Sequence, residues 1–414
     1  MNSPLPRVRG RPLTLDVLAV LLLLGLISLA ILWVMYDVAL VRQMWRLHMN
    51  DFGRFYYSAQ YLLEGRDLYG PSPATLMPVS DVDSRQLWNL NPPHFQLLIC
   101  PLGALSPGAA LLVWTAASLA SLALATRALV RAIGPLRWTP TRVVLVCFGL
   151  LAFAGTGSLL LTGQLSWLLL WPVITVWLDL RSGRWHRAGA ILGALATVKP
   201  FFAILFAVFI LRRQFRPLVT GVLAGSATIA LGVVLAGPES YLSWLRALRS
   251  TDWSQSAMNA SILGVLSRSL SANPYFAPFV RRPDLILPLW AVLAVSVAAC
   301  TIGAVVRREQ TDASFSLLLL AGLLVSPLGW VYYWWFVLPP LVVLIGKGLL
   351  RKQFVLAVPI VLSALWPLPA TLLSQPSPFA TITVGSLYFW GMFLLWIAVL
   401  RDRPPCPAST LTAA

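Results

Sequence analysis

The sequence has little charge and very few lysines, histidines and cysteines. Charged residues make up 11% of its 414 positions and hydrophobic residues 58%, whereas a soluble domain carries about 25% charged residues. This composition excludes an ordinary soluble domain. It also excludes a disordered or nucleic-acid-binding basic chain, because the basic residues of such proteins lie in polar sequence. We therefore predict a polytopic membrane protein, even though the net charge is +17.

The scarce cysteines and histidines also argue against metal and disulfide chemistry. The 4 cysteines have no C-x-x-C spacing and lie mostly in apolar runs, and the 3 histidines are far apart. The sequence has no phosphate-binding loop, dinucleotide fingerprint, H-E-x-x-H or G-x-S-x-G motif. We expect no cofactor and no bound metal.

Long apolar runs dominate what the sequence does contain. The first, 13–35, follows Arg7, Arg9 and Arg11; it is long enough to cross a hydrocarbon core of roughly 30 Å and too long for the core of a signal peptide. Together these runs predict an all-α bundle of about ten spans. The other runs are 108–132, 143–161, 165–180, 218–236, 285–306, 315–330, 331–346, 354–373 and 382–400.

Two apolar segments do not fit a simple span. Segment 94–105 is too short to cross a membrane and is bounded by prolines, which favours a re-entrant or interfacial helix. Segment 188–211 has Lys199-Pro200 at its centre and arginine clusters at both ends. Because arginines favour the cytoplasmic side, flanks on one side predict a broken hairpin that turns at Lys199-Pro200.

This hairpin gives the chain a consistent orientation. With both termini in the cytoplasm, most of the positive charge falls on the cytoplasmic side, as the positive-inside rule requires. Two long outer loops remain, 37–93 and 237–283, in which we expect interfacial helices. We interpret residues 1–414 as a single multi-pass domain of the cell (inner) membrane.

Asp51 is the first candidate for chemistry. It opens a stretch of helical periodicity in the first outer loop, where Asp is a favoured N-cap. A carboxylate just outside the first span could instead accept a proton from a hydroxyl nucleophile. The two interpretations are compatible.

Lys199 is the second candidate. A lysine at membrane depth is costly and usually faces a cavity or a charged partner, for which a lipid phosphate would be suitable. Its position at a break between half-helices is typical of ion-facing sites in transporters. The alternative is that its ammonium group snorkels to the membrane surface.

Further polar and aromatic residues occur in the outer turns. Gln164 lies in a tight turn, where it could bind sugar hydroxyls or only serve the turn. Asn259 and Arg268 flank apolar positions of an expected interfacial helix. Tyr332 and Tyr333 belong to an aromatic cluster that could be a membrane belt or a surface on which sugars stack.

Six short stretches resemble one known family in their order along the chain. They are DFGRFYYSAQYLLEGRDLYG, NPPHFQLLICPLGALSP, TGQLSWLLL, AGAILGALATVKPFFAILF, NASILGVLSR and SPLGWVYYWWFVLPP. In this order the sequence resembles the GT-C membrane glycosyltransferases that use polyprenyl-phosphate sugars. More narrowly, it resembles glycosyltransferase family 87, the polyprenol-phosphate-mannose-dependent alpha-mannosyltransferases.

The resemblance implies a GT-C bundle and roles for several residues. Asp51 matches the essential acidic residue of the first outer loop, and Lys199 matches the lysine of the broken hairpin, where a donor phosphate would bind. Gln164, Asn259 and Arg268 match polar positions facing the same cavity, and in the implied mechanism Arg268 would help Lys199 to stabilise the leaving phosphate.

The implied reaction transfers a hexose, mannose in the family, from a polyprenyl phosphate to a glycolipid or glycan acceptor. It would take place on the extracytoplasmic side, with inversion. Family members often carry a His pair where this chain has Tyr332-Tyr333. That departure either weakens the mannose assignment or moves more of the proton transfer onto Asp51.

Two other classes of protein fit parts of the sequence. A transporter or lipid flippase would suit the broken hairpin and its lysine, although the long outer loops and the lack of visible inverted repeats argue against it. A third interpretation is a non-catalytic membrane subunit. The enzyme hypothesis requires Asp51 and Lys199 to face one outward cavity, separated by about the length of a sugar phosphate.

Overall fold

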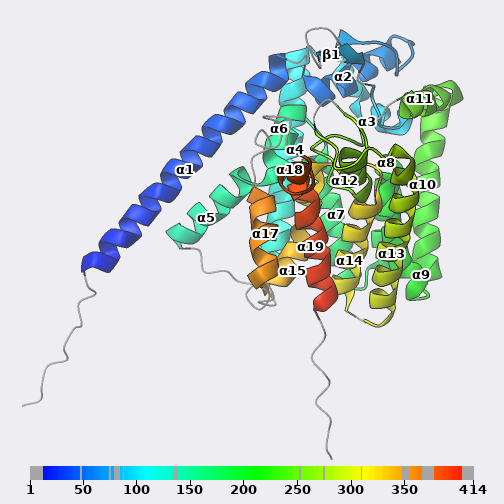
Figure 1. Ribbon diagram of the computed structural model, residues 1–414. Helices are drawn as coiled ribbons and strands as arrows, with labels where there is room; N and C mark the ends of the chain where they lie inside the picture. Colours follow the sequence, from blue (N-terminus) through cyan, green and yellow to red (C-terminus); the bar gives the residue numbers. More distant parts are fainter. Residues whose placement is uncertain are drawn as a thin grey trace, which may run out of the picture.

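The computed structural model describes most of the chain, and over that part the protein is almost entirely helical (Figure 1). The exception is one antiparallel hairpin of two short strands, β1 (Leu76–Pro78) and β2 (Ser84–Gln86). Arg7, Arg9 and Arg11, which precede the first apolar run, lie outside the described residues. The described residues are 13–46, 49–73, 76–78, 84–86, 88–133, 139–250, 253–273, 276–308, 310–346, 354–365 and 377–402.

The architecture is that of an all-α membrane protein, as the sequence predicts. Among the described residues, 5 helical stretches are long and apolar enough to cross a membrane. They are Ile27–Leu63, Pro107–Ala132, Phe215–Ala236, Pro283–Val306 and Pro378–Arg401. The count of about ten spans stays a prediction.

The elements of the first outer loop gather at one end of the molecule. The long helix α1 (Leu13–Arg46) leads to α2 (Asn50–Leu63), and α3 (Pro93–Gly103) packs against α2. Helix α11 (Pro238–Ser250) lies at the same end, while the start of α1 and the end of α19 (Leu387–Arg401) lie at the opposite end (Figure 1).

The remaining elements form the body of the bundle. They are α4 (Pro107–Ile133), α5 (Pro140–Leu151), α6 (Ala154–Thr162), α7 (Ser166–Arg181), α8 (Trp185–Val198), η2 (Pro200–Phe206), α9 (Ala207–Leu211), α10 (Phe215–Ala236), α12 (Ile262–Leu270), η3 (Pro283–Leu285), α13 (Ile286–Val306), α14 (Thr311–Val325), η4 (Val331–Val337), α15 (Leu338–Gly346), α17 (Phe354–Leu365), α18 (Pro378–Ile382) and η6 (Val384–Ser386). Helix α14 lies in the core, since every residue from Ala313 to Leu324 is buried.

Two apolar runs end or break where the sequence suggests continuity. The run 143–161 is divided into α5 and α6, and an extended Phe153 precedes α6. The run 315–330 stops as helix at Val325, because Ser326 is extended before Pro327, a residue that disfavours helical backbone in its predecessor. Hydrophobicity alone did not reveal either interruption.

Helices α8 and α10 make the closest helix contact of the site region. A Cβ added to Gly193 would lie 2.0 Å from the carbonyl oxygen of Gly221, and one added to Gly189 would lie 2.3 Å from that of Pro217. Small residues spaced four apart permit such backbone approach. Gly189 meets Pro217 and Gly193 meets Gly221, so later positions of α8 meet later positions of α10. The two helices therefore run parallel.

The parallel arrangement has a consequence for the segment between these helices. Two parallel neighbours require the chain to return between them, so η2 and α9 run back after α8 ends. Lys199 has extended backbone at this turn, and Pro200 begins η2. The chain therefore reverses after Lys199-Pro200, while the membrane hairpin over 188–211 stays a prediction.

Candidate active site

Asp51 stands at the start of α2, on an unusual stretch of backbone. Met49 and Asn50 have φ angles of 65° and 48°, in the left-handed region that residues other than glycine rarely adopt. No side chain caps the amino end of α2. The capping interpretation of Asp51 is therefore wrong, and its buried carboxylate points to other partners.

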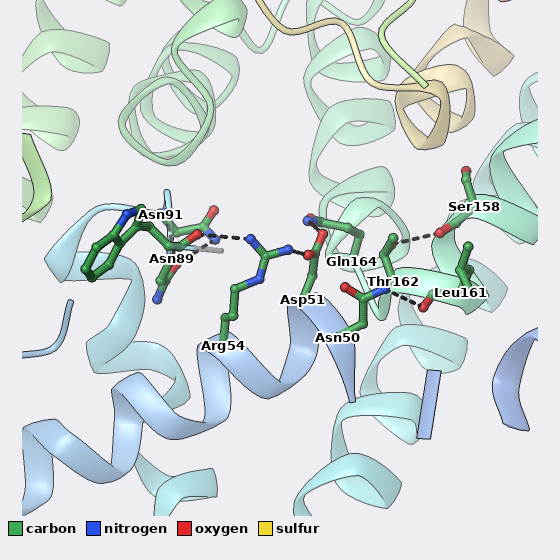
Figure 2. Close-up of polar contacts among 10 residues, drawn as sticks. Asn50, Asp51, Arg54, Asn89, Asn91, Ser158, Leu161, Thr162 and Gln164 are labelled. Atoms are coloured by element: carbon green, nitrogen blue, oxygen red, sulfur yellow. Dashed lines mark hydrogen bonds and ion pairs between the residues drawn. The ribbon is translucent and has the colours of Figure 1, made fainter. Parts of the chain in front are cut away.

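Those partners are Arg54 and Gln164 (Figure 2). Arg54 lies three residues further along α2 and forms an ion pair with Asp51. The amide nitrogen Nε2 of Gln164 donates a hydrogen bond to Oδ2 of Asp51. The carboxylate is thus held between a cation from its own helix and an amide from the α6–α7 turn.

Gly163 allows that turn to approach α2. Its φ is 68°, and a Cβ at this position would lie 2.7 Å from Cβ of Phe52. A neighbouring bond fixes the contact, because Nδ2 of Asn50 donates to the carbonyl of Leu161 at 3.1 Å. The residue before Gln164 must therefore be glycine for the amide to reach Asp51.

Segment 88–91 connects Arg54 to Lys199. Nη1 of Arg54 donates to the carbonyl of Trp88 at 3.0 Å, and Nζ of Lys199 donates to Oδ1 of Asn91 at 3.0 Å. Asn91 is itself fixed, since its backbone N–H and its amide both donate to Oδ1 of Asn89. Asp51 and Lys199 thus belong to one continuous polar network.

The tyrosine pair lies beside the same two cations. Lys199 lies over the ring of Tyr333, with Nζ 5.8 Å from the ring centroid, and the charge of Arg54 acts on Tyr332. The two rings meet edge to face at 5.0 Å, and Phe201 packs on Tyr333. The tyrosine pair of η4 is therefore close to both cations.

Asn259 belongs to a second cluster, formed by the second outer loop. Its side-chain nitrogen donates to the carbonyls of Ser254 and Pro327, and its side-chain oxygen accepts from the N–H groups of Ser261 and Gly329. An isolated β-bridge also joins Asn259 to Trp330. Asn259 therefore ties the second outer loop to the segment that precedes η4.

Arg268 lies in this second cluster as well. The residue is fully buried, and its Nη1 donates to the carbonyls of Ser256 and Asn259, while Nη2 donates to the hydroxyl of Ser386. Burial lowers the pKa of Arg268 to about 9, so the guanidinium stays charged at neutral pH. No carboxylate among the described residues pairs with it.

The structure thus divides the seven predicted site residues into two groups. One network includes or adjoins Asp51, Gln164, Lys199, Tyr332 and Tyr333. The other two residues belong to the second cluster, in which Arg268 donates to the carbonyl of Asn259.

Sequence reasoning missed Arg54 and Asn91. Two signals were available: an acid and an arginine three apart on one helix form a pair, and an Asn before Pro92-Pro93 is held extended. In the part of the chain that the structure describes, no three His, Cys, Asp or Glu side chains gather as a metal site would require.

Comparison with known proteins identifies the sequence family of the chain. The model of glycosyltransferase family 87 matches residues 89–328, more than half of the chain. The chain belongs to glycosyltransferase family 87. The match includes Asn91, Gln164 and Lys199, while Asp51 and Tyr332 lie outside the matched region.

Two mycobacterial relatives share one name, polyprenol-phosphate-mannose-dependent alpha-(1-2)-phosphatidylinositol mannoside mannosyltransferase. The protein from Mycobacterium tuberculosis is 28% identical over 351 residues, which cover 79% of this chain and 78% of the relative. The protein from Mycolicibacterium smegmatis is 33% identical over 193 residues, or 44% of this chain and 41% of the relative. No solved structure matches the chain significantly.

These comparisons decide the class of this family 87 protein. It is a membrane glycosyltransferase, which favours the enzyme over the transporter, flippase and subunit alternatives.

Proposed function

We propose that this protein transfers a hexose from a polyprenyl-phosphate sugar to the hydroxyl of a glycolipid, with inversion at the anomeric carbon. The relatives' names make mannose the first sugar to test and a phosphatidylinositol mannoside the first acceptor. The reaction would take place at the extracytoplasmic face, with both termini in the cytoplasm. The common end of α2, α3 and α11, opposite the start of α1 and the end of α19, agrees with this orientation (Figure 1).

The observation that carries the proposal is the network joining Asp51 to Lys199. An inverting transfer needs a base near the attacking hydroxyl and a positive charge near the leaving phosphate. The segment 88–91 links Arg54, which pairs with Asp51, to Lys199 through Trp88 and Asn91. A carboxylate and a cation held by one short segment suit a sugar phosphate placed between them.

In this mechanism Asp51 accepts the proton of the acceptor hydroxyl as its oxygen attacks C1 of the donor sugar. The bond between C1 and the phosphate oxygen breaks, and its electron pair stays on the phosphate. Lys199 stabilises the negative charge that develops there. Gln164 orients the carboxylate, and the Tyr332 and Tyr333 rings offer faces on which the sugar stacks.

We assign Asn259 and Arg268 to the frame of the site, because their side chains bond to backbone carbonyls and to Ser386. In this role they hold the second outer loop against η4. Direct binding of the donor phosphate by Arg268 is the alternative, and it predicts a raised KM for the donor in a variant that stays folded.

The deciding experiment offers purified protein a panel of radiolabelled polyprenyl-phosphate sugars with a phosphatidylinositol mannoside acceptor. We expect transfer from the mannose donor, and Asp51→Asn should reduce kcat by about 10³-fold, within the range that one acid–base group contributes. Arg66→Gln, at an exposed ion pair with Glu64, is the matched control. Wild-type turnover by the Asp51 variant would exclude Asp51 as the base.

A further inference from the structure

We propose that Arg54 changes partners during the reaction: it pairs with Asp51 in the free enzyme and with the donor phosphate once the donor binds. The inference rests on the proposed function and adds a second phosphate-binding residue to it. In this exchange, Asp51 is released to act as the base only when the donor binds.

The position of Arg54 is the first argument. Figure 2 shows its side chain between Asp51 on one side and the Asn89–Asn91 segment on the other. Arg54 and Lys199 donate to opposite ends of the same segment 88–91, at Trp88 and Asn91. Lys199 also lies over the ring of Tyr333, and the charge of Arg54 acts on the adjacent Tyr332. Two short stretches of chain therefore hold both cations near each other.

The charge of the network is the second argument. Arg54 and Lys199 carry two positive charges, and Asp51 is the one carboxylate that pairs with either of them among the residues that the structure describes. The network thus has an excess of one positive charge in a buried setting, where an uncompensated charge is costly. A polyprenyl-phosphate sugar carries one ionised phosphate oxygen, which would balance that charge.

The bonding of the guanidinium is the third argument. Nε of Arg54 is buried and has no hydrogen-bond partner, so the group has capacity left for an anion. A guanidinium can form two parallel bonds to phosphate, which a lysine cannot. Nε of Arg268 is also without a partner, but its Nη1 and Nη2 donate to the backbone carbonyls of Ser256 and Asn259 and to Ser386. Nη2 of Arg54 instead pairs with the side chain of Asp51, a partner that an anion can replace.

The chemical consequence concerns Asp51. An ion pair stabilises the charged form of a carboxylate, so a paired carboxylate accepts a proton less readily than a free one. When the phosphate draws Arg54 away, Asp51 becomes the stronger base. The acceptor hydroxyl is therefore activated only in a site that already holds the donor.

The test measures binding of a short-chain polyprenyl phosphate that lacks the sugar, by calorimetry on the full chain in lipid nanodiscs. Arg54→Gln should weaken binding at least tenfold, and Arg54→Lys less, because the lysine keeps the charge. Asp51→Asn should tighten binding about tenfold, since it removes the group that competes for Arg54. The double variant should bind like Arg54→Gln alone, and Arg66→Gln like wild type.

The signs of these changes separate the possible outcomes. A merely structural role for Arg54 gives no reason for Asp51→Asn to bind the phosphate more tightly. Unchanged or weaker binding by Asp51→Asn would overturn the exchange of partners and leave the proposed function standing. Failure of the wild type to bind the probe would overturn both.

Discussion

The two buried polar clusters of this protein differ in what their charges bind. Around Asp51, charged groups bind mainly side chains: Arg54 pairs with Asp51 and donates to one backbone carbonyl, that of Trp88, and Lys199 donates to the side chain of Asn91. Around Arg268, the charge is held largely by backbone carbonyls of the outer loop. Side-chain partners can exchange for a ligand, whereas backbone carbonyls belong to the fold. Substitutions in the first cluster should therefore change activity, and substitutions in the second should change stability.

Among the further variants that would test this comparison, Lys199→Ala should have the largest effect. Loss of the ammonium group should lower kcat/KM for the donor by about 100-fold, chiefly through KM, with the fold intact. Initial rates over a range of donor concentrations would measure the change. An unchanged dependence on donor concentration would show that Lys199 does not bind the donor.

Asn259→Ala should have a smaller effect, and on stability. The variant loses four hydrogen bonds to backbone groups of two segments, which should lower the free energy of unfolding by about 2–4 kcal/mol. Thermal unfolding in detergent would detect this as a lower Tm. If the Tm were unchanged and the donor KM rose, Asn259 would contact the substrate instead, and the comparison would fail.

The smallest effect concerns His94, which joins the two outer loops to the end of α8. Its Nε2 donates to the carbonyl of Thr197, and its Nδ1 faces the hydroxyl of Tyr241 at 3.0 Å. Burial lowers the pKa of His94 below its usual 6.5, so the folded state favours the neutral ring. The unfolded chain then binds more protons in acid, and stability falls as the pH drops through 6.5 towards the lower value.

Unfolding temperatures from about pH 7.5 to about pH 5.5 would show this dependence. His94→Gln should flatten the curve, because glutamine does not titrate in this range. An equally steep curve in that variant would assign the pH dependence to other groups.

The sequence singled out the candidate site residues that carry local signals. Lys199 stands out because a proline follows it and arginines flank its run, and both signals are visible without a fold. Asp51 was singled out for the same reason, as an acid beside a span, and the roles of both residues in the reaction stay predictions. The capping role of Asp51 was wrong because α2 begins after two left-handed residues, Met49 and Asn50, which local preferences do not predict.

The partners of these residues could not be predicted in the same way. Gln164 reaches Asp51 only because Gly163 lets two distant segments meet, and Asn91 reaches Lys199 across 108 positions of sequence. Such pairs depend on tertiary packing. The helix break between α5 and α6 was missed for a related reason, since both halves are equally apolar.

The close contact between α8 and α10 also fixes the height of Lys199 relative to α11. Helix α10 ends at Gly237, where the chain bends into α11, and α11 is bonded to the first outer loop by Trp244, whose Nε1 donates to the carbonyl of Leu90. A lipid-anchored donor holds its phosphate at a set height above the hydrocarbon. Since α8 cannot slide on α10 without a clash of backbones at Gly193, Lys199 keeps a constant height relative to α11. In the proposed function, this constant height would set the level at which the donor phosphate binds.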